Sequence, residues 1–235
     1  MDIQAPEPSL RMAVATASAP VGRVAEPAAA VAPVAYRVAK RALDLVLATV
    51  AIAVSAPIWL IVAALVGFTS PGPVLFRQTR VGKDGRLFSV LKFRSMCADA
   101  EARLQALGLY DAYVAAGYKL HVADEFRVTK VGRFIRKTSL DELPQLLNVL
   151  RGDMSMVGPR PVEHGQLSDY GDLVHCYLGV RPGITGIWQV SGRSNIHFPE
   201  RAHLDLSYFH RRSLLLDLAI LARTPLAVVK AQGAH

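Results

Sequence analysis

Residues 42–76 form a long apolar stretch in which Asp44 is the only charged residue. A helix of about 20 apolar residues already crosses a bilayer, so this stretch is long enough to be embedded in a membrane. Pro57, near its middle, removes one backbone hydrogen bond and disfavours helix at the residue before it. We therefore expect two helical halves, residues 42–55 and 58–68, that are separated by a break.

Basic residues flank this stretch on both sides; they are Arg37, Lys40 and Arg41 before it and Arg77, Arg80 and Lys83 after it. The positive-inside rule places both of its ends on the cytoplasmic face of a membrane. A helix-break-helix that enters the bilayer and returns satisfies both signals. The alternative is a single-pass helix kinked at Pro57, because proline is tolerated in spanning helices.

The pattern then changes to short alternating segments, residues 74–81 and 86–93, and the glycine-flanked residues 82–85 between them predict a β-hairpin. Helical spacing of apolar residues predicts further helices over residues 99–116, 139–150, 199–212 and 213–229. Apolar residues surround most of the last segment, which is typical of a helix at the membrane interface and equally of a core helix.

Residues 1–36 are rich in Ala, Val and Pro, and the prolines interrupt any helical or strand period. This composition predicts a disordered leader. We expect an anchoring helix-break-helix over residues 37–73 and a cytosolic domain over residues 74–235. The expected fold class is α+β and mostly helical, with a short hairpin and amphipathic interfacial helices.

The composition changes this picture by adding charge. Among 235 residues, 51% are hydrophobic, and 27 Lys and Arg against 19 Asp and Glu give a net charge of +8. An apolar and basic chain suits a membrane surface or a polyanion. The two cysteines exclude a disulfide scaffold and a cysteine-rich metal site, and they fit a reducing compartment. No Gly-x-Gly-x-x-Gly, Walker A or His-Glu-x-x-His pattern is present, which excludes the familiar nucleotide and zinc sites.

Charged residues are concentrated between residues 127 and 142. The cations of this segment are Arg127, Lys130, Arg133, Arg136 and Lys137, and two adjacent carboxylates follow at Asp141 and Glu142. One interpretation is structural: Ser139-x-x-Glu142 matches a helix capping box, and the cations form a solvated face. The other is chemical, because adjacent carboxylates can hold Mg²⁺ or act as nucleophile and base while cations neutralise phosphate.

Two further constellations carry cations. Gly158-Pro159-Arg160-Pro161 places a guanidinium between two residues of fixed φ, which suits a bidentate grip on phosphate or, more simply, a solvated turn. Lys92 and Arg94 lie at the end of the second hairpin strand, where basic residues are usually just solvated.

Taken in order, several uncommon motifs resemble the bacterial sugar transferase family, the monotopic phosphoglycosyl transferases, from about Arg37 onward. The motifs are Lys40-Arg41-x-x-Asp44, Pro57 in the apolar stretch, Gly72-Pro73-Val74, Lys92-Phe93-Arg94-Ser95-Met96, Leu140-Asp141-Glu142-Leu143-Pro144-Gln145, the segment from Gly152 to Pro161, and Pro182-Gly183-Ile184-Thr185-Gly186.

The resemblance implies transfer of a sugar 1-phosphate from a UDP-sugar to polyprenyl (undecaprenyl) phosphate through a covalent phosphosugar intermediate, with release of UMP. It implies Asp141 as nucleophile, Glu142 as Mg²⁺ ligand or base, and Mg²⁺ as cofactor, held by both carboxylates. It assigns the substrate phosphates and nucleotide to Lys92, Arg94, Arg136 and the Pro159-Arg160-Pro161 motif. Under this interpretation the carboxylate pair lies close to the cation cluster.

The resemblance also implies a place in the cell. The chain is expected at the cytoplasmic face of the bacterial inner membrane, at the first membrane step of exopolysaccharide or capsule assembly. Its expected partners are the two substrates and membrane lipid, with downstream glycosyltransferases and a second copy of the chain as further candidates. In the family a Ser directly precedes the break Pro, whereas here Ser55 lies one position earlier, before Ala56 and Pro57.

Two other classes of function remain as alternatives. A membrane-anchored basic module could bind nucleic acid or acidic polysaccharide through residues 127–137, although only Phe126 and Phe134 accompany these cations as stacking groups, so no nucleic acid is expected. A non-catalytic scaffold of the same fold is the second alternative, and the intact pair Asp141-Glu142 argues against it. The sugar, the lipid length and the pathway are not encoded in these motifs.

Overall fold

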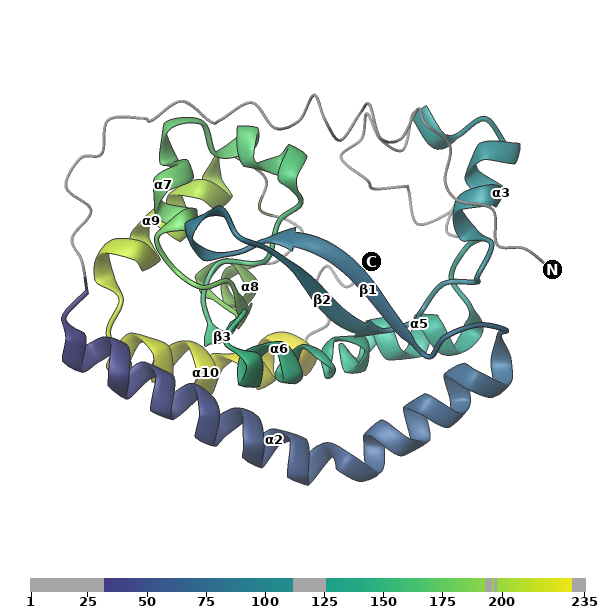
Figure 1. The fold of residues 1–235 in the computed structure, drawn as a ribbon, viewed down its shortest axis with the longest axis horizontal. Coiled ribbons are helices and arrows are strands. Elements are labelled where there is room, and N and C mark those ends of the chain that lie inside the picture. The colour runs from purple at the N-terminus through teal and green to yellow at the C-terminus, as the bar shows by residue number, and fades with distance from the viewer. Residues whose placement is uncertain (1–31, 112–125, 193–195, 197, 230–235) are drawn as a thin grey trace. The chain divides into compact units, whose positions relative to one another are not determined.

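The computed structural model describes residues 32–111, 126–192, 196 and 198–229 (Figure 1). The leader expected at residues 1–36 therefore falls, up to residue 31, outside the described residues. The elements follow in the order α2 (Val34–Thr69), β1 (Leu75–Val81), η1 (Lys83–Gly85), β2 (Leu87–Phe93), α3 (Ala100–Ala106), α5 (Lys130–Lys137), η3 (Leu140–Glu142), α6 (Gln145–Arg151), β3 (Ser155–Val157), η4 (His164–Leu173), α7 (Val174–Leu178), β4 (Gly183–Thr185), α8 (Ile187–Ser191), α9 (Glu200–Arg211) and α10 (Leu214–Val229).

Helix α2 is one continuous helix of 36 residues that contains Pro57. The prediction of two helices separated by a break is wrong in this respect: the chain bends near the middle of α2 without leaving the helical conformation (Figure 1). A helix of this length spans about 54 Å. It is long and apolar enough to cross a membrane by length and composition.

Side chains on both sides of Pro57 form hydrogen bonds with each other across the turn that contains it. The Ser55 hydroxyl donates to the carbonyl oxygen of Ala51 at 2.5 Å and accepts a hydrogen bond from Trp59 Nε1 at 3.0 Å. A Ser hydroxyl that binds the preceding turn is a known source of helix bending. The indole thus bridges the turn in which proline supplies no N–H, and its ring packs edge-on against Phe93 of β2 at 5.7 Å.

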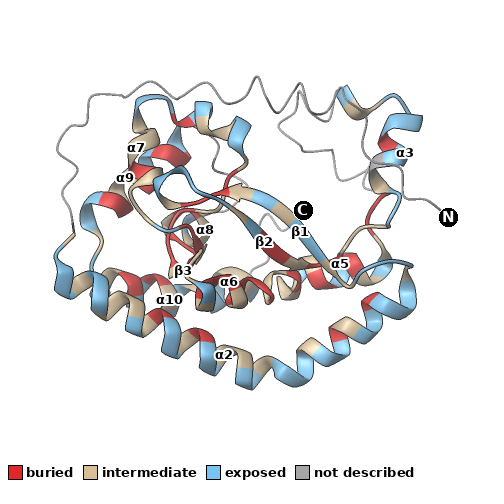
Figure 2. Cartoon of the chain, viewed as in Figure 1, coloured by how far each residue is buried: buried red, intermediate tan, exposed pale blue. Residues whose placement is uncertain are grey.

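One face of α2 is exposed and the other packs on the remaining elements (Figure 2). The exposed face carries large apolar side chains, which are Val34, Val38, Leu45, Val46, Val50, Val54, Ile58, Leu60, Ile61, Leu65 and Phe68. Helix α10 adds Leu215, Leu218, Leu226 and Val229. An exposed apolar surface of this extent marks a contact site for a membrane or a partner.

The inward face of α2 carries a buried ionic cluster. Asp44 accepts hydrogen bonds at 3.0 Å from the Ser155 hydroxyl and from the Met156 backbone N–H in β3. Lys40 Nζ lies 3.7 Å from Asp44 and 3.1 Å from Asp217 of α10. Buried charges are tolerated when they are paired and hydrogen-bonded, so this cluster joins α2 to β3 and α10.

Arg41, the second residue of the Lys40-Arg41-x-x-Asp44 motif, binds the end of α6. Its guanidinium donates to the carbonyl oxygens of Val149 at 2.6 Å and Leu150 at 2.9 Å. These carbonyls belong to the last turn of α6, where the Val149 oxygen also accepts from the C-cap residue Gly152 N at 3.1 Å. The motif Lys40-Arg41-x-x-Asp44 therefore holds α2 to the rest of the described chain.

The hairpin prediction is confirmed. Strands β1 and β2 pair antiparallel, with Gln78 opposite Val90 and Phe76 opposite Lys92. The buried side chain of Asn148 in α6 accepts from Leu91 N at 3.0 Å and donates to Ser89 O at 2.7 Å. The Asn148 side chain thereby satisfies one backbone N–H and one backbone carbonyl on the edge of β2 that faces away from β1.

A second, parallel pair of strands brings distant segments together. Ser155 of β3 pairs with Gly183 of β4, and Val157 pairs with Thr185. The backbones approach so closely that a Cβ on Gly158 would lie 2.3 Å from the carbonyl oxygen of Arg181. Only glycine fits at such an approach.

The remaining helices match the predicted segments in part. Helices α9 and α10 confirm the two predicted tail helices. The helix predicted over residues 99–116 is shorter, because α3 ends at Ala106, and residues 112–116 lie outside the described residues. The described chain is mostly helical, as the sequence predicts, but it contains a second small sheet, the parallel pair β3 and β4, that the sequence does not predict.

Candidate functional site

Asp141 lies in the tight turn η3 between α5 and α6. The preceding Ser139 adopts φ 57°, in the left-handed region, and its side chain makes no capping hydrogen bond. The capping box is therefore not formed, and that interpretation of the motif is wrong. Pro144 stands at the N-cap of α6, which begins only at Gln145. The carboxylates stand in a strained turn, a conformation that often marks functional sites.

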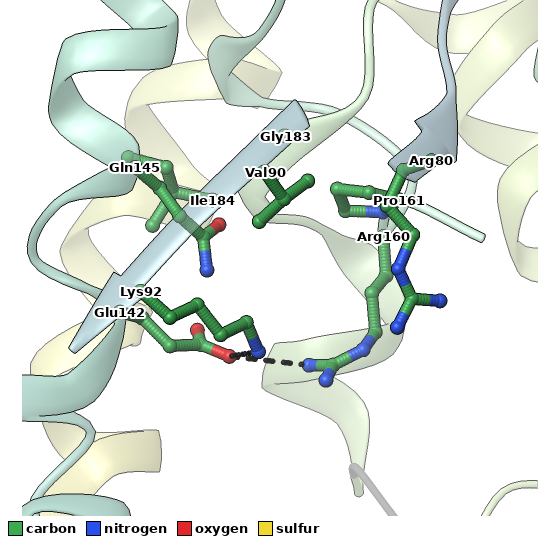
Figure 3. Close-up of a pocket in the computed structure, with 9 residues that line it drawn as sticks. All are labelled: Arg80, Val90, Lys92, Glu142, Gln145, Arg160, Pro161, Gly183 and Ile184. Atoms are coloured by element: carbon green, nitrogen blue, oxygen red, sulfur yellow. Dashed lines mark hydrogen bonds and ion pairs between the residues drawn. The ribbon is translucent and has the colours of Figure 1, made fainter. Parts of the chain in front are cut away.

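Glu142 meets two of the predicted cations (Figure 3). Its Oε1 atom lies 3.3 Å from Lys92 Nζ and 3.6 Å from a terminal nitrogen of Arg160. These side chains come from three separate elements: η3, β2 and the loop after β3. The predicted closeness of the carboxylate pair to the cations is confirmed for Lys92 and Arg160.

Asp141 is 9% exposed. Burial, followed by the neighbouring charge of Glu142, raises its pKa to about 6, while Lys92, Arg136 and Arg160 oppose this rise. With a pKa of about 6, the carboxyl is mostly ionised at pH 7 and becomes protonated in mild acid. A group poised in this range suits proton or nucleophilic chemistry.

Helix α5 places Arg136 close enough to influence Asp141. Thr129 caps this helix by accepting a hydrogen bond from Gly132 N at 2.8 Å. A Cβ on Gly132 would lie 1.8 Å from the carbonyl oxygen of Ser95. The missing side chain therefore allows α5 to pack against the segment that follows β2.

A pocket opens in front of Glu142. The described residues that line it are Arg80, Val90, Lys92, Glu142, Gln145, Arg160, Pro161, Gly183 and Ile184 (Figure 3). Three cations face one carboxylate there, which gives the pocket a positive character. Anionic groups such as phosphates are favoured in such a place.

The charge pattern of the sequence predicts Arg80 only as a flanking charge of the apolar stretch, but the hairpin pattern carries a signal for its place at this pocket. In an antiparallel hairpin, directly opposed residues point to the same face, and so do residues two apart. The register pairs Gln78 with Val90 and Phe76 with Lys92, which puts Arg80 on the face of Lys92. No pattern in the sequence predicted that Gln145, Gly183 and Ile184 line this pocket.

The three residues of the Pro159-Arg160-Pro161 motif have different environments. Arg160 and Pro161 line the pocket, whereas the Pro159 side chain is fully buried and its carbonyl oxygen accepts a hydrogen bond from Gly183 N at 2.8 Å. The first proline therefore anchors the loop. Its predicted contact with substrate stays a prediction.

Arg94 is placed differently from Lys92. It is buried, and its Nη2 atom donates to the Ser70 carbonyl oxygen at 2.6 Å and to the Ser70 hydroxyl at 2.8 Å. Ser70 is the C-cap residue of α2. In the described chain Arg94 thus fastens the end of α2 to β2, and its predicted contact with substrate stays a prediction.

The residues present fit a divalent cation in one particular way. Within the described ranges no group of three or more His, Cys, Asp or Glu side chains could enclose a metal ion. Mg²⁺ is commonly bound through one or two carboxylates together with substrate phosphates. Asp141 and Glu142 supply those carboxylates beside a pocket suited to phosphates.

Comparison with known proteins identifies the family of this chain. The family model described as "Bacterial sugar transferase" matches residues 35–231. The chain is 39% identical over 228 residues to the exopolysaccharide production protein ExoY of Rhizobium meliloti, covering 96% of this chain and 100% of that protein.

Two longer relatives carry more specific names. An undecaprenyl-phosphate galactose phosphotransferase of Salmonella typhimurium is 41% identical over 85% of this chain and 42% of its own length. A UDP-glucose:undecaprenyl-phosphate glucose-1-phosphate transferase of Escherichia coli is 40% identical over 80% of this chain and 39% of its own length. The chain thus spans less than half of these two relatives, and it belongs to the bacterial sugar transferase family.

Proposed function

We propose that this chain transfers a sugar 1-phosphate from a UDP-sugar to undecaprenyl phosphate. The observation that carries the proposal is the convergence of Lys92 and Arg160 on Glu142, beside a buried Asp141, at the wall of a positive pocket. Relatives named as undecaprenyl-phosphate sugar phosphotransferases support the same substrates. An exopolysaccharide or capsule pathway follows from the relatives named for exopolysaccharide production.

Asp141 acts as the nucleophile. Its carboxylate oxygen attacks the phosphorus that carries the sugar, and the bond from this phosphorus to the bridging oxygen breaks. UMP leaves with that oxygen, and the sugar phosphate stays esterified to Asp141. A phosphate oxygen of undecaprenyl phosphate then attacks the same phosphorus, which frees the carboxylate and completes the lipid diphosphate.

The cations stabilise charge where it develops. In the first step negative charge grows on the departing UMP and on the transferring phosphoryl oxygens. Lys92, Arg136 and Arg160 act on Asp141 electrostatically, so they can also reach a phosphorus that Asp141 attacks. Fixed cations at a partly buried site lower the barrier because they need little reorganisation.

Asp141 and Glu142 would hold Mg²⁺ together with the donor phosphates. When bound, the ion supplies Lewis-acid neutralisation of the diphosphate. Glu142 meanwhile keeps Lys92 and Arg160 oriented through its ion pairs. As the alternative to a metal-binding role, Glu142 would accept a proton from the incoming lipid phosphate before the second step.

The exposed apolar faces of α2 and α10 sit in the cytoplasmic leaflet of the inner membrane. Both substrates meet there, since a soluble nucleotide sugar reaches the lipid head group at the membrane surface. Basic residues at both ends of the apolar stretch favour a helix that enters and returns. The bend at Pro57 supports the same geometry (Figure 1).

The decisive experiment measures UMP release by the detergent-purified full chain with Mg²⁺, undecaprenyl phosphate and a panel of UDP-sugars. We expect release from one preferred donor and none from Asp141→Asn. Incubation with that donor but without lipid should add the mass of one sugar phosphate to the wild-type chain. Peptide mapping should place it on Asp141.

Asp84→Asn is the matched control, because Asp84 is an exposed aspartate in the hairpin turn. It should keep full activity and full labelling. Turnover by folded Asp141→Asn, or labelling at another residue, would refute the nucleophile assignment. Loss of UMP release with every donor in the wild type would refute the function itself.

The membrane topology has its own test. Arg37→Cys and Arg77→Cys are made one at a time in a Cys97→Ser/Cys176→Ser background and treated with a membrane-impermeant maleimide. We expect neither to be labelled in intact spheroplasts and both to be labelled after lysis. Labelling of one position in intact spheroplasts would show a spanning helix.

A further inference from the structure

A second pocket shares Arg80 with the pocket that contains Glu142. Its volume is about 400 Å³, within the roughly 300–1,000 Å³ range of ligand sites. Its described lining includes Gln78, Arg80, Leu87, Glu163, His164 and Gly165.

The two pockets are also continuous along the chain. Arg160 and Pro161 line the first, and residues 163–165 line the second. Val162 between them is fixed to β1, because Val81 N donates to its carbonyl oxygen at 3.0 Å. Arg80 lines both pockets, so a ligand phosphate that pairs with Arg80 at the first pocket lies beside the second.

The polar groups of the second pocket form one network. Glu163 Oε1 accepts from Gln78 at 2.9 Å and pairs with Arg80 at 3.1 Å, and Arg80 also donates to Gln78 Oε1 at 2.6 Å. On its other side Glu163 forms a capping box with Gln166 at the start of η4. The carboxylate is thus held in one orientation before any ligand arrives.

The chemistry of this lining favours a hydroxyl-rich ligand. A carboxylate has about four lone-pair sites, and Gln78, Arg80 and the Gln166 backbone N–H occupy three. At least one site can accept from a ligand hydroxyl, and His164 adds a second polar group. No Phe, Tyr or Trp is found among the described residues that line the pocket, so it offers no stacking surface for a base.

We propose that the second pocket binds the hexosyl group of the nucleotide sugar and that Glu163, oriented by Gln78 and Arg80, reads its hydroxyl configuration. This inference rests on the proposed function. The sugar lies on one side of the diphosphate and the nucleoside on the other, so a pocket that adjoins the phosphate site serves one of them. The absence of a stacking group favours the sugar.

The test compares wild type with Glu163→Gln, which keeps shape but removes charge. For each protein kcat/KM is measured for the preferred UDP-hexose and for its C4 epimer, and UMP affinity is measured by calorimetry. We expect the ratio between the two donors to change by about tenfold or more, since a site that hydrogen-bonds a substrate hydroxyl discriminates strongly against the epimer that misplaces it. UMP affinity should stay within about twofold, because UMP has no hexose.

Asp169→Asn is the matched control, because it makes the same acid-to-amide change at an exposed position of η4 outside the described lining of the pocket. It should leave the donor ratio unchanged. An unchanged ratio in Glu163→Gln, or an equal loss for both donors together with weaker UMP binding, would overturn the proposal and point to the ribose. Those results require wild-type turnover, so they are distinct from failure of the proposed function, in which the wild type releases no UMP from any donor.

Discussion

Arg201 of α9 donates a hydrogen bond from Nη2 to the main-chain carbonyl oxygen of Arg160 at 3.3 Å. The indole of Trp188 lies under both guanidinium groups, 4.6 Å from that of Arg201 and 5.8 Å from that of Arg160. Cations over an indole face are attracted by its ring electrons. Arg201 is therefore a positioning residue for the loop that presents Arg160 to the pocket.

We expect Arg201→Met to raise KM for the UDP-sugar about tenfold, by loosening the Arg160 loop. In an Arg160→Ala background the same change should add little, because the group it positions is gone. Steady-state kinetics of the single and double variants measure this coupling. Arg211→Met, at an exposed position of the same helix, serves as control, and additive effects in the double variant would contradict the positioning role.

The pH dependence of kcat/KM should report Asp141. Its pKa is raised to about 6 by burial and by Glu142, and a nucleophilic carboxylate must be ionised. Activity should therefore rise with pH through about 6. Lys92 lowers this pKa, so Lys92→Met should move the acidic limb to higher pH, whatever it does to the maximal rate. An unmoved limb would show that another group controls it.

The charge of Asp141 should also lower the free energy of unfolding at neutral pH. The folded chain holds the Asp141 proton more tightly than the unfolded chain does, because the pKa rises from 3.8 to about 6 on folding. The stabilisation from this proton is present below about pH 4 and is lost as the pH rises through 6. At pH 7 the free energy of unfolding of Asp141→Asn should thus exceed that of the wild type by on the order of 2–3 kcal/mol.

Thermal unfolding of both proteins in the same detergent, at pH 5 and pH 7, measures this effect. The difference between them should shrink at pH 5, where the wild-type carboxyl is largely protonated. An equal or lower melting temperature for Asp141→Asn at pH 7 would contradict it.

Lys40→Met should destabilise the chain by about 3–5 kcal/mol, because it leaves two buried carboxylates without their cation. Those carboxylates are Asp44 and Asp217, at 3.7 Å and 3.1 Å from Lys40 Nζ. The double variant Lys40→Met/Asp217→Asn should recover part of the loss. Melting temperatures of the three proteins test this, and a Lys40→Met chain as stable as the wild type would contradict it.

Asn148→Leu should cost about 2–5 kcal/mol, since it strips two buried backbone groups of their partners at once. Leu is close to Asn in size, so lost packing adds little. Urea unfolding of the purified protein measures the change. A loss below about 1 kcal/mol would show that water replaces the amide at the edge of β2.

Local patterns predicted much of this molecule. Alternation and the Gly82–Gly85 connection predicted the hairpin, because hairpin signals depend on neighbours in sequence. The resemblance to the family, rather than charge alone, predicted that Lys92 and Arg160 lie close to Glu142. The apolar period also located α9 and α10.

The misses arise where distant parts of the chain decide the conformation. Ser139-x-x-Glu142 has the capping pattern, but Ser139 is left-handed and the helix begins after Pro144. Pro57 bends α2 without ending it, and the side chains of Ser55 and Trp59 are hydrogen-bonded across the turn that contains it. The buried role of Arg94 at Ser70 depends on tertiary packing that no short motif encodes.

The bond from Tyr36 to Asp217, which spans 181 residues at 3.1 Å, has a consequence for biosynthesis. At roughly 5–20 residues per second, the ribosome completes the partner about 10–35 seconds after it has made Tyr36. Throughout that interval α2 must exist without the last helix. The i,i+4 pair of Lys40 with Asp44 lies within α2 itself, so each of these charges has a partner while the rest of the chain is still being made.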